Sequence, residues 1–280
     1  MTTVTITASQ VKELREATNV GMMECKKALT ESGGDMDAAI QLLRERGMVI
    51  AGKKAGRAAN EGLIAAEVAD GGQLGVIVEV NCETDFVARN ESFQEFVSQV
   101  VAKGRQVDGD LAEVFKDELT SKIAEIGENL IIRRNDRYEL QGTGAVASYI
   151  HLGGKVGVLL EVGCESAETA SADAFKEVVK DITLHIAASN PDYLTRDDAP
   201  EDVLATEREI FVKQAEGKPE NIVEKIVDGK MEKFFGQNCL VEQPFVKDGD
   251  ISISQLLAAK GKELGDELTI RRFVRYQIGA

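Results

Sequence analysis

The sequence predicts an α+β protein, in which a small N-terminal helical bundle precedes a duplicated core with mainly antiparallel sheets. Two observations carry this prediction. Apolar residues before residue 50 recur at helical spacing, and the rest of the chain repeats itself. The second copy of the repeat is interrupted by a two-helix pattern. We therefore expect two related subdomains, the second of which carries an inserted helical hairpin.

The N-terminal segment 1–50 is expected to form a domain of three short helices. Thr7 and Gln10 are spaced for a capping box at the start of the first helix, and Asp35 is a natural N-cap for the third. A break at 19–21 separates the first two helices. The apolar and small residues spaced along the three helices are Val11, Leu14, Thr18, Met22, Cys25, Ala28, Leu29, Ala39, Ile40 and Leu43.

The remainder of the chain contains two internal repeats. Residues 72–100 align without a gap with residues 154–182, at a shift of 82. Residues 127–140 align with residues 265–278 at a shift of 138, so the second copy holds an insertion of about 56 residues. Each copy predicts a strand, a glycine-rich hairpin turn, a second strand, helices and a third strand. Positions of the first copy that are identical in the second are Gly72, Gly75, Val76, Glu79, Val80, Cys82, Glu83, Phe93, Glu95 and Val97.

These patterns divide the chain beyond the bundle into four parts. The alanine- and glycine-rich segment 51–61 is expected to be a linker. Core subdomain N is expected to span residues 62–142, and core subdomain C residues 143–187 and 238–280. The inserted hairpin is expected at 188–237.

The insertion predicts two helices joined by a short turn at 217–219, the first of them beginning at Pro200. The second helix carries a single apolar stripe. Such a stripe can be buried within the hairpin, docked on the protein's own core, or paired with another chain in a self-association. We expect it to be buried within the hairpin.

The composition argues against nucleic acid and membrane as direct partners. The chain has 280 residues, a net charge of −15 and a pI near 4.7, whereas phosphate binding needs a basic face. No apolar run approaches the roughly 20 residues that span a bilayer, and the N-terminus lacks the pattern of a secretory signal. A cytoplasmic protein is therefore expected.

The sequence also offers no enzyme active site. The four cysteines are widely spaced, which favours reduced thiols in the core. Two histidines are too few for a zinc-like cluster. The chain lacks a phosphate-binding P-loop and a nucleophile elbow. We expect no catalytic residues, no cofactor and no metal site.

The most informative stretch is NCETDFVARN, residues 81–90, where a strand passes into a helix. The repeat provides an internal control, because Asp85 aligns with Ala167 and Phe86 aligns with Glu168. A glutamate is almost never buried without a partner, so the fold has no requirement for a buried aromatic at this turn. Asp85 could simply be an N-cap, and Phe86 could fold back onto its own helix. We favour an exposed Asp85-Phe86 pair that binds a partner.

Several stretches resemble one known family, the bacterial elongation factor Ts proteins. They are TNVGMMECKKAL, NCETDFVA, IGENLIIRR, SYIH, HIAAS and QPFV, which occur in order along essentially the whole chain. The resemblance implies a guanine nucleotide exchange factor in translation elongation. It would bind the GTPase elongation factor Tu, both GDP-bound and nucleotide-free, and promote loss of magnesium and GDP from it, so that GTP can reload.

The resemblance also implies which residues contact the GTPase. Residues matching the family's wedge, which enters near the magnesium side of the nucleotide site, are Thr84, Asp85, Phe86 and Val87. Further contacts would be made by Leu14, Met22, Met23 and Lys26 of the bundle, and by His151, which would reach a different domain of the GTPase.

An adaptor is the alternative function. The N-terminal bundle is similar to ubiquitin-associated domains, and methionine-rich faces bind many partners. An adaptor, however, gives no reason for an Asp85-Phe86 pair in only one of the two halves.

Overall fold

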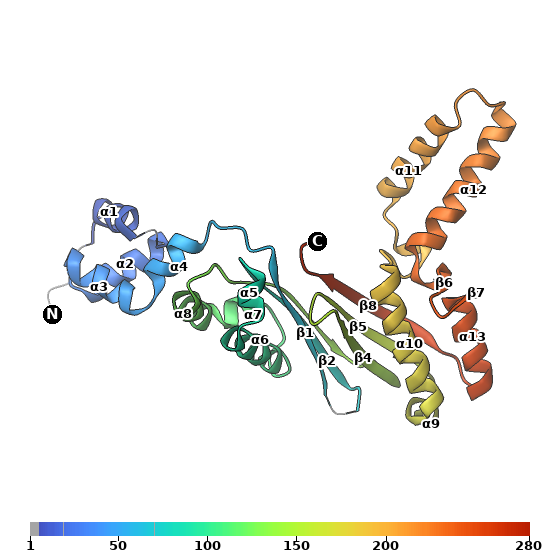
Figure 1. Ribbon diagram of the computed structural model, residues 1–280, viewed down its shortest axis with the longest axis horizontal. Coiled ribbons are helices and arrows are strands. Elements are labelled where there is room, and N and C mark those ends of the chain that lie inside the picture. Colours follow the sequence, from blue (N-terminus) through green and yellow to red (C-terminus); the bar gives the residue numbers. More distant parts are fainter. Residues whose placement is uncertain (1–5, 19, 70) are drawn as a thin grey trace.

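The computed structural model describes residues 6–18, 20–69 and 71–280. Asn19, at the expected break after the first helix, and Asp70, in the first hairpin turn, lie outside this set. The molecule is elongated, with the N-terminal bundle at one end and the inserted hairpin projecting from the other (Figure 1). None of the helices in these ranges is long and apolar enough to cross a membrane.

The N-terminal bundle forms as the spacing predicts. The Gln10 amide donates to Thr7 Oγ1 at 3.3 Å and the Thr7 amide donates to Gln10 Oε1 at 3.0 Å, so the capping box is confirmed. Asp35 caps the third helix by accepting a hydrogen bond from the Ala38 amide at 2.9 Å. The helices are α1 (Ala8–Thr18), α2 (Met22–Glu31) and α3 (Met36–Glu45), with Leu14, Cys25, Ala28, Leu29, Ala39 and Leu43 fully buried between them.

The linker begins later than the sequence predicts. A fourth helix, α4 (Met48–Lys54), follows Gly47, whose φ is 69°. Val49 is buried in the bundle and Ala51 packs against the core of subdomain N, so an apolar face extends the helix past residue 50. A Cβ on Gly47 would lie 2.9 Å from Ala124 Cβ, so the bundle lies directly against the core at this point.

The duplicated core consists of two three-stranded antiparallel sheets with the same topology. One sheet has the order β1-β2-β3 and the other β4-β5-β8. The ladder register shifts after Glu79 in the first and after Glu161 in the second, which are equivalent positions. The strands are β1 (Glu61–Ala69), β2 (Leu74–Cys82), β3 (Ile131–Glu139), β4 (Gly144–His151), β5 (Val156–Gly163) and β8 (Thr269–Gln277).

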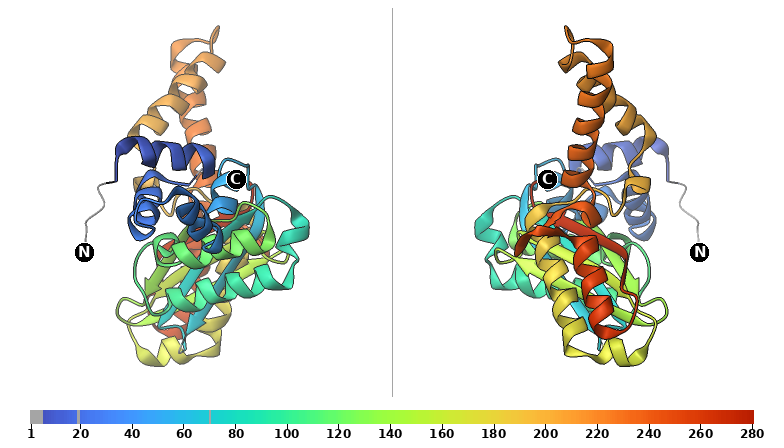
Figure 2. Two further views of the ribbon diagram at one scale, coloured as in Figure 1. Left: turned by 90° about the vertical axis from the view of Figure 1, so that its left-hand side faces the viewer. Right: turned by 90° about the vertical axis from the view of Figure 1, so that its right-hand side faces the viewer.

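Helices cover the outer face of each sheet, which gives a four-layer core (Figures 1 and 2). Phe93 and Phe96 anchor the helices of subdomain N on the first sheet, and Phe175 and Ile186 do so on the second. The prediction of strand, turn, strand, helices and strand in each half is confirmed. The helices are α5 (Asp85–Ala88), α6 (Glu91–Gly104), α7 (Leu111–Val114) and α8 (Lys116–Ile126) in subdomain N, and α9 (Ala167–Ser171), α10 (Asp173–Ser189) and α13 (Ile253–Leu264) in subdomain C.

The two sheets pack against each other through a separate apolar cluster, and two equivalent glycines allow the approach. A Cβ on Gly75 would lie 2.6 Å from Leu159 Cδ1, and one on Gly157 would lie 2.4 Å from Ile64 Cγ2. Neither contact is tolerable, so larger residues would push the sheets apart. The buried residues of this inter-sheet cluster are Ile64, Ile77, Tyr138, Val146, Leu159 and Tyr276.

A fully buried glutamate lies in the middle of each sheet. Glu79 accepts from Arg134 Nε at 2.7 Å and from Arg133 Nη1 at 3.3 Å. Its equivalent, Glu161, accepts from Arg272 Nε at 2.7 Å and from Arg271 Nη1 at 3.2 Å. A buried carboxylate is tolerated only when it is paired in this way.

Each arginine pair also reaches the opposite subdomain. The Arg134 guanidinium lies 4.1 Å from the centroid of the Tyr276 ring, and that of Arg272 lies 4.1 Å from the Tyr138 ring. Tyr276 in turn donates to Asp136 at 2.5 Å. The pairing therefore ties each sheet to the other as well as satisfying its own glutamate.

The inserted hairpin is made of α11 (Glu201–Gln214) and α12 (Glu220–Asn238). It packs on itself, as expected, but none of the α11 residues is buried, and Val227 and Met231 are the buried side chains among the described α12 residues. Its base is fixed by Arg196, which bonds both carboxylate oxygens of Glu232, at 2.8 and 2.6 Å, and of Glu242, at 2.5 and 2.7 Å.

The segment after the insertion adds two short strands that the sequence analysis did not predict. A short hairpin of β6 (Pro244–Phe245) and β7 (Asp248–Ser252) leads back to α13. All four cysteines, Cys25, Cys82, Cys164 and Cys239, are free and buried, as predicted.

Replacing Glu79 by Gln should lower the free energy of unfolding by about 3 kcal/mol, because two arginines lose their buried counter-charge. Glu161→Gln should have a similar effect, since its surroundings are equivalent. Urea denaturation followed by far-UV circular dichroism measures both. The control is Glu95→Gln on the exposed face of α6, which should stay within about 0.5 kcal/mol of wild type. A loss confined to one of the two glutamates would contradict the equivalence.

Candidate partner-binding site

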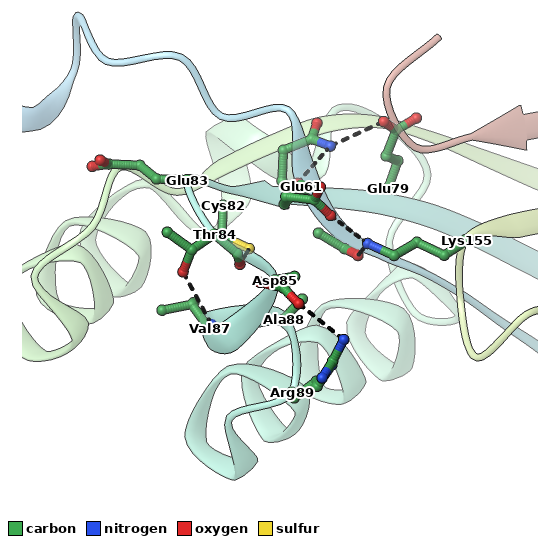
Figure 3. Close-up of polar contacts among 12 residues, drawn as sticks. Glu61, Glu79, Cys82, Glu83, Thr84, Asp85, Val87, Ala88, Arg89 and Lys155 are labelled. Carbon is green, nitrogen blue, oxygen red and sulfur yellow. Dashed lines mark hydrogen bonds and ion pairs between the residues drawn. The ribbon is translucent and has the colours of Figure 1, made fainter.

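The Asp85-Phe86 turn is held rigidly by the hydrogen bonds of Thr84, which precedes it, and of Glu128, which lies against it from another loop. Thr84 is the N-cap of α5, and its hydroxyl accepts a hydrogen bond from the Val87 amide at 3.3 Å (Figure 3). Glu128, from the loop before β3, accepts from the Thr84 amide at 3.0 Å and from the Thr84 hydroxyl at 2.7 Å. It also accepts from the Glu83 amide at 3.0 Å. The alternative in which Asp85 is the N-cap was wrong, because Thr84 takes that position.

Glu83 completes a reciprocal lock with the same loop. Its carboxylate accepts from the Asn129 amide at 2.7 Å and from Arg57 at 3.3 Å. The Asn129 amide, together with Arg57, lowers the pKa of the Glu83 carboxyl. The two loops are therefore tied by backbone amides in both directions, which leaves little freedom to the residues that follow.

Phe86 points away from the protein. Its side chain is 80% exposed, the largest exposed fraction among the described large apolar residues. Val87 is half-buried against the core of subdomain N and Ala88 is buried, so the helix is anchored through its far side. Asp85 forms an exposed ion pair with Arg89 at 2.9 Å (Figure 3). The alternative in which Phe86 folds back onto its helix was therefore wrong.

The equivalent turn in subdomain C has the same anchor without the aromatic residue. Ser166 caps α9 by accepting from the Thr169 amide at 3.1 Å. Asp266, the equivalent of Glu128, accepts from the amides of Glu165 at 2.9 Å and Ser166 at 3.0 Å. The Thr169 side chain and these backbone amides hold the pKa of Asp266 well below its usual value. The fold thus builds the rigid turn twice and places a phenylalanine on only one of them.

The bundle residues implied by the resemblance fall into two groups. Met22 and Met23, in the first turn of α2, are 47% and 75% exposed, and Lys26 is exposed one turn further on. Leu14 is fully buried in the bundle. It therefore supports the helices from inside, and the expectation of a direct contact does not fit this structure.

His151 is the last residue of β4 and is exposed at the β4–β5 turn. Its Nδ1 lies 3.0 Å from the Tyr149 hydroxyl, and the two rings stack with centroids 5.8 Å apart. Leu152 follows with a φ of 49° and is 69% exposed. The sequence analysis did not single out Leu152 and Tyr149 as part of the surface around His151. For Leu152 a signal was available, since a leucine before two glycines in a hairpin turn is expected to be exposed.

The structure brings His151 and the Asp85-Phe86 turn to the same end of the core. Lys155, in the turn that begins at His151, bonds Glu61 at 2.6 Å (Figure 3). Glu61 pairs with Cys82, which immediately precedes the Glu83–Phe86 segment. The bundle, by contrast, lies at the end of the molecule beyond α8 (Figure 1).

Comparison with known proteins decides the family. The model of the family described as elongation factor TS matches residues 83–280. An elongation factor Ts of Trichlorobacter lovleyi is 47% identical, over 98% of this chain and 93% of the relative. Elongation factor Ts of Clostridium perfringens strain SM101 is also 47% identical, with the same coverage, and that of Nitratidesulfovibrio vulgaris strain DP4 is 45% identical over 98% of this chain and 96% of the relative.

This chain belongs to the elongation factor Ts family. The resemblance in the sequence is thereby confirmed, and with it the general role of the family in protein biosynthesis, nucleotide exchange on elongation factor Tu. Elongation factor Ts proteins are exchange factors, which catalyse no chemical reaction.

The lowered pKa of Glu83 makes the stability of the locked turn depend on pH. Because the folded pKa lies below the unfolded value, the stabilisation is complete above about pH 4.5 and is lost as the pH falls further. The difference in urea midpoint between wild type and Glu83→Gln should therefore be largest at neutral pH and should become smaller below about pH 4.5.

The same pH series on Glu168→Gln, an exposed glutamate of the equivalent turn, gives the baseline for removing one carboxyl. A difference between wild type and Glu83→Gln that stays constant with pH would contradict the lock.

Proposed function

We propose that this chain binds elongation factor Tu in its GDP-bound form and promotes loss of magnesium and GDP, with Phe86 acting as the wedge. The observation that carries the proposal is an 80% exposed phenylalanine on a turn fixed by Glu128. Glu168 at the equivalent position indicates that the fold has no need of an aromatic residue there, and a rigidly held aromatic side chain is well suited to be a binding hot spot.

The rigid turn suits a wedge because a flexible loop would lose conformational entropy on insertion. Phe86 inserts between helices of the GTPase and shifts them, so the groups that hold magnesium move. The phosphates then lose the ion and their own ligands. Asp85 arrives beside that site, and its side-chain partner among the described residues is the exposed Arg89. Such a pair contributes little and is easily broken, so Asp85 is free to accept a hydrogen bond or to repel the phosphates.

Energetics require more than this one residue. A shift of about 10⁴ in nucleotide affinity needs roughly 5.5 kcal/mol of differential binding, and a phenylalanine buried at an interface supplies about 2 to 4 kcal/mol. By linkage, bound nucleotide lowers the affinity of the GTPase for the exchange factor by the same ratio. Further contacts with the GTPase must therefore supply the rest of the differential binding free energy.

The exposed residues implied by the resemblance supply these contacts. Met22, Met23 and Lys26 form a surface on the bundle that is separate from the wedge, and His151 presents a second surface on the core. We leave Leu14 out of the contact set, because it has no exposed surface. An adaptor function would use the methionine face alone and would leave Phe86 without a role. We also expect the encounter to take place in the cytoplasm, without direct binding of nucleic acid.

Phe86→Ala should slow release of fluorescent GDP from elongation factor Tu at least about tenfold, because the wedge loses its buried side chain. The far-UV spectrum and the melting temperature should be nearly unchanged, since the ring makes little contact with its own protein. Stopped-flow fluorescence measures the release.

The matched control is Glu168→Ala, which truncates the equivalent position of the second turn and should exchange as wild type does. No acceleration of release by the wild-type protein would overturn the proposed function. A loss of several kcal/mol of stability in Phe86→Ala would instead place the ring in the core.

Glu128→Ala should lower the exchange rate by about tenfold while leaving Phe86 in place, because small displacements of a positioning group are costly. The same assay checks it. Asp266→Ala, which removes the equivalent anchor in subdomain C, is the control for the general effect of loosening such a turn. Equal losses in the two variants would contradict a specific role for the Glu128 anchor.

A further inference from the structure

We infer that the groove between β4 and α10 is a second docking site for the GTPase, and that it takes an acidic segment carrying an apolar side chain. This inference rests on the proposed function, since it assigns a further contact to the same partner. The groove has a volume of about 510 Å³, within the range of sites that hold ligand groups.

The walls of the groove are apolar and two lysines stand at its rim. Small residues of β4, Ala145 and Ala147, form the floor, and Val179 of α10 forms one wall. Lys176 and Lys180, one helical turn apart, are both exposed at the rim. Lys176 forms an exposed ion pair with Asp173 of its own helix at 3.4 Å, whereas Lys180 forms no ion pair with any described residue. An exposed pair such as that of Lys176 is easily exchanged, so an apolar floor beneath these two ammonium groups suits an acidic segment with one apolar anchor.

The internal repeat shows that the fold does not require this groove. In subdomain N, Leu63 stands where Ala145 stands, and Val101 stands where Thr183 stands. The positions of Lys176 and Lys180 are occupied by Gln94 and Ser98. The larger side chains of the first half pack against its core. The space and the positive rim are therefore features of subdomain C alone, as Phe86 is of subdomain N.

The charges of α10 are separated by face. Lys176 and Lys180 line the groove, whereas Asp181 on the other side of the helix bonds Lys247 at 2.6 Å. Glu177 and Asp181 both lie near Lys260 of α13. Glu177 and Asp181 are thus turned to basic partners in the protein, Lys176 pairs with Asp173 at the start of the helix, and Lys180 is left for an external partner.

The groove is continuous with the His151 surface. Tyr149 lines the groove and its hydroxyl lies 3.0 Å from His151 Nδ1. Ala145, Ala147, Tyr149 and His151 alternate along β4 and therefore lie on the same face of the strand. A partner segment that touches His151 would extend along this face into the groove.

Two variants test the groove, one by charge and one by shape. Lys180→Glu should raise the concentration of the factor that gives half-maximal GDP release about fivefold, and should weaken its dependence on salt. Ala145→Leu installs the residue of the first half, fills the floor and should raise the half-maximal concentration by a similar factor. In both, the maximal release rate at saturation should stay near that of wild type, because Phe86 is unchanged.

Lys262→Glu, the same charge change at an exposed site on α13, is the control and should bind as wild type does. Melting temperatures establish that each variant is folded. Wild-type half-maximal concentrations in both groove variants would overturn the inference. So would an effect of Lys180→Glu without one of Ala145→Leu, since that pattern would indicate surface charge alone. Failure of the wild-type protein to accelerate release is a different outcome, which overturns the proposed function itself.

Discussion

The core depends on two buried glutamates, whose arginine partners also contact the opposite half of the molecule. Glu79 and Glu161 are satisfied by arginines of their own sheets, and the same arginines stack on tyrosines of the other sheet. A buried carboxylate without its arginine costs several kcal/mol, so each arginine is fixed on its glutamate, and its contact with the tyrosine of the other sheet is fixed with it. The two subdomains are therefore one rigid unit, although the sequence repeat describes two.

This rigidity gives the partner-binding surfaces a fixed spacing. The turn that carries Phe86 is tied to the loop before β3 through Glu128, and the turn that carries His151 is tied to β1 through Lys155. Both ties connect to the paired sheets, so the two surfaces cannot move independently. A factor that must displace an ion inside its partner needs a rigid core of this kind. A flexible core would itself change conformation on binding, and less binding energy would go into changing the partner.

Much of this arrangement could be predicted from the sequence because the chain repeats itself. A shift of 82 residues predicts the strands of the second half from those of the first, and the exposure of Phe86 follows from its replacement by Glu168. Other features depend on contacts between distant segments. The helix α4 was missed because its stability comes from packing of Val49 and Ala51, and local composition favoured a linker. Glu128 was missed as an anchor because it lies 44 residues from Thr84. The burial of Leu14, by contrast, agreed with its helical spacing and disagreed with the contact that the resemblance implied.

The overall acidity of the molecule bears on what the two lysines of the β4–α10 groove can do. With a net charge of −15, long-range fields favour approach by basic surfaces of a partner and disfavour acidic ones. Salt screens such fields beyond about 8 to 10 Å, so a short acidic segment can still be recognised where two lysines face it directly. The groove lysines of this acidic protein would thus orient a bound partner segment rather than attract it from a distance. They select among the approaches that the general field permits, and they do so on the same face of β4 that presents His151.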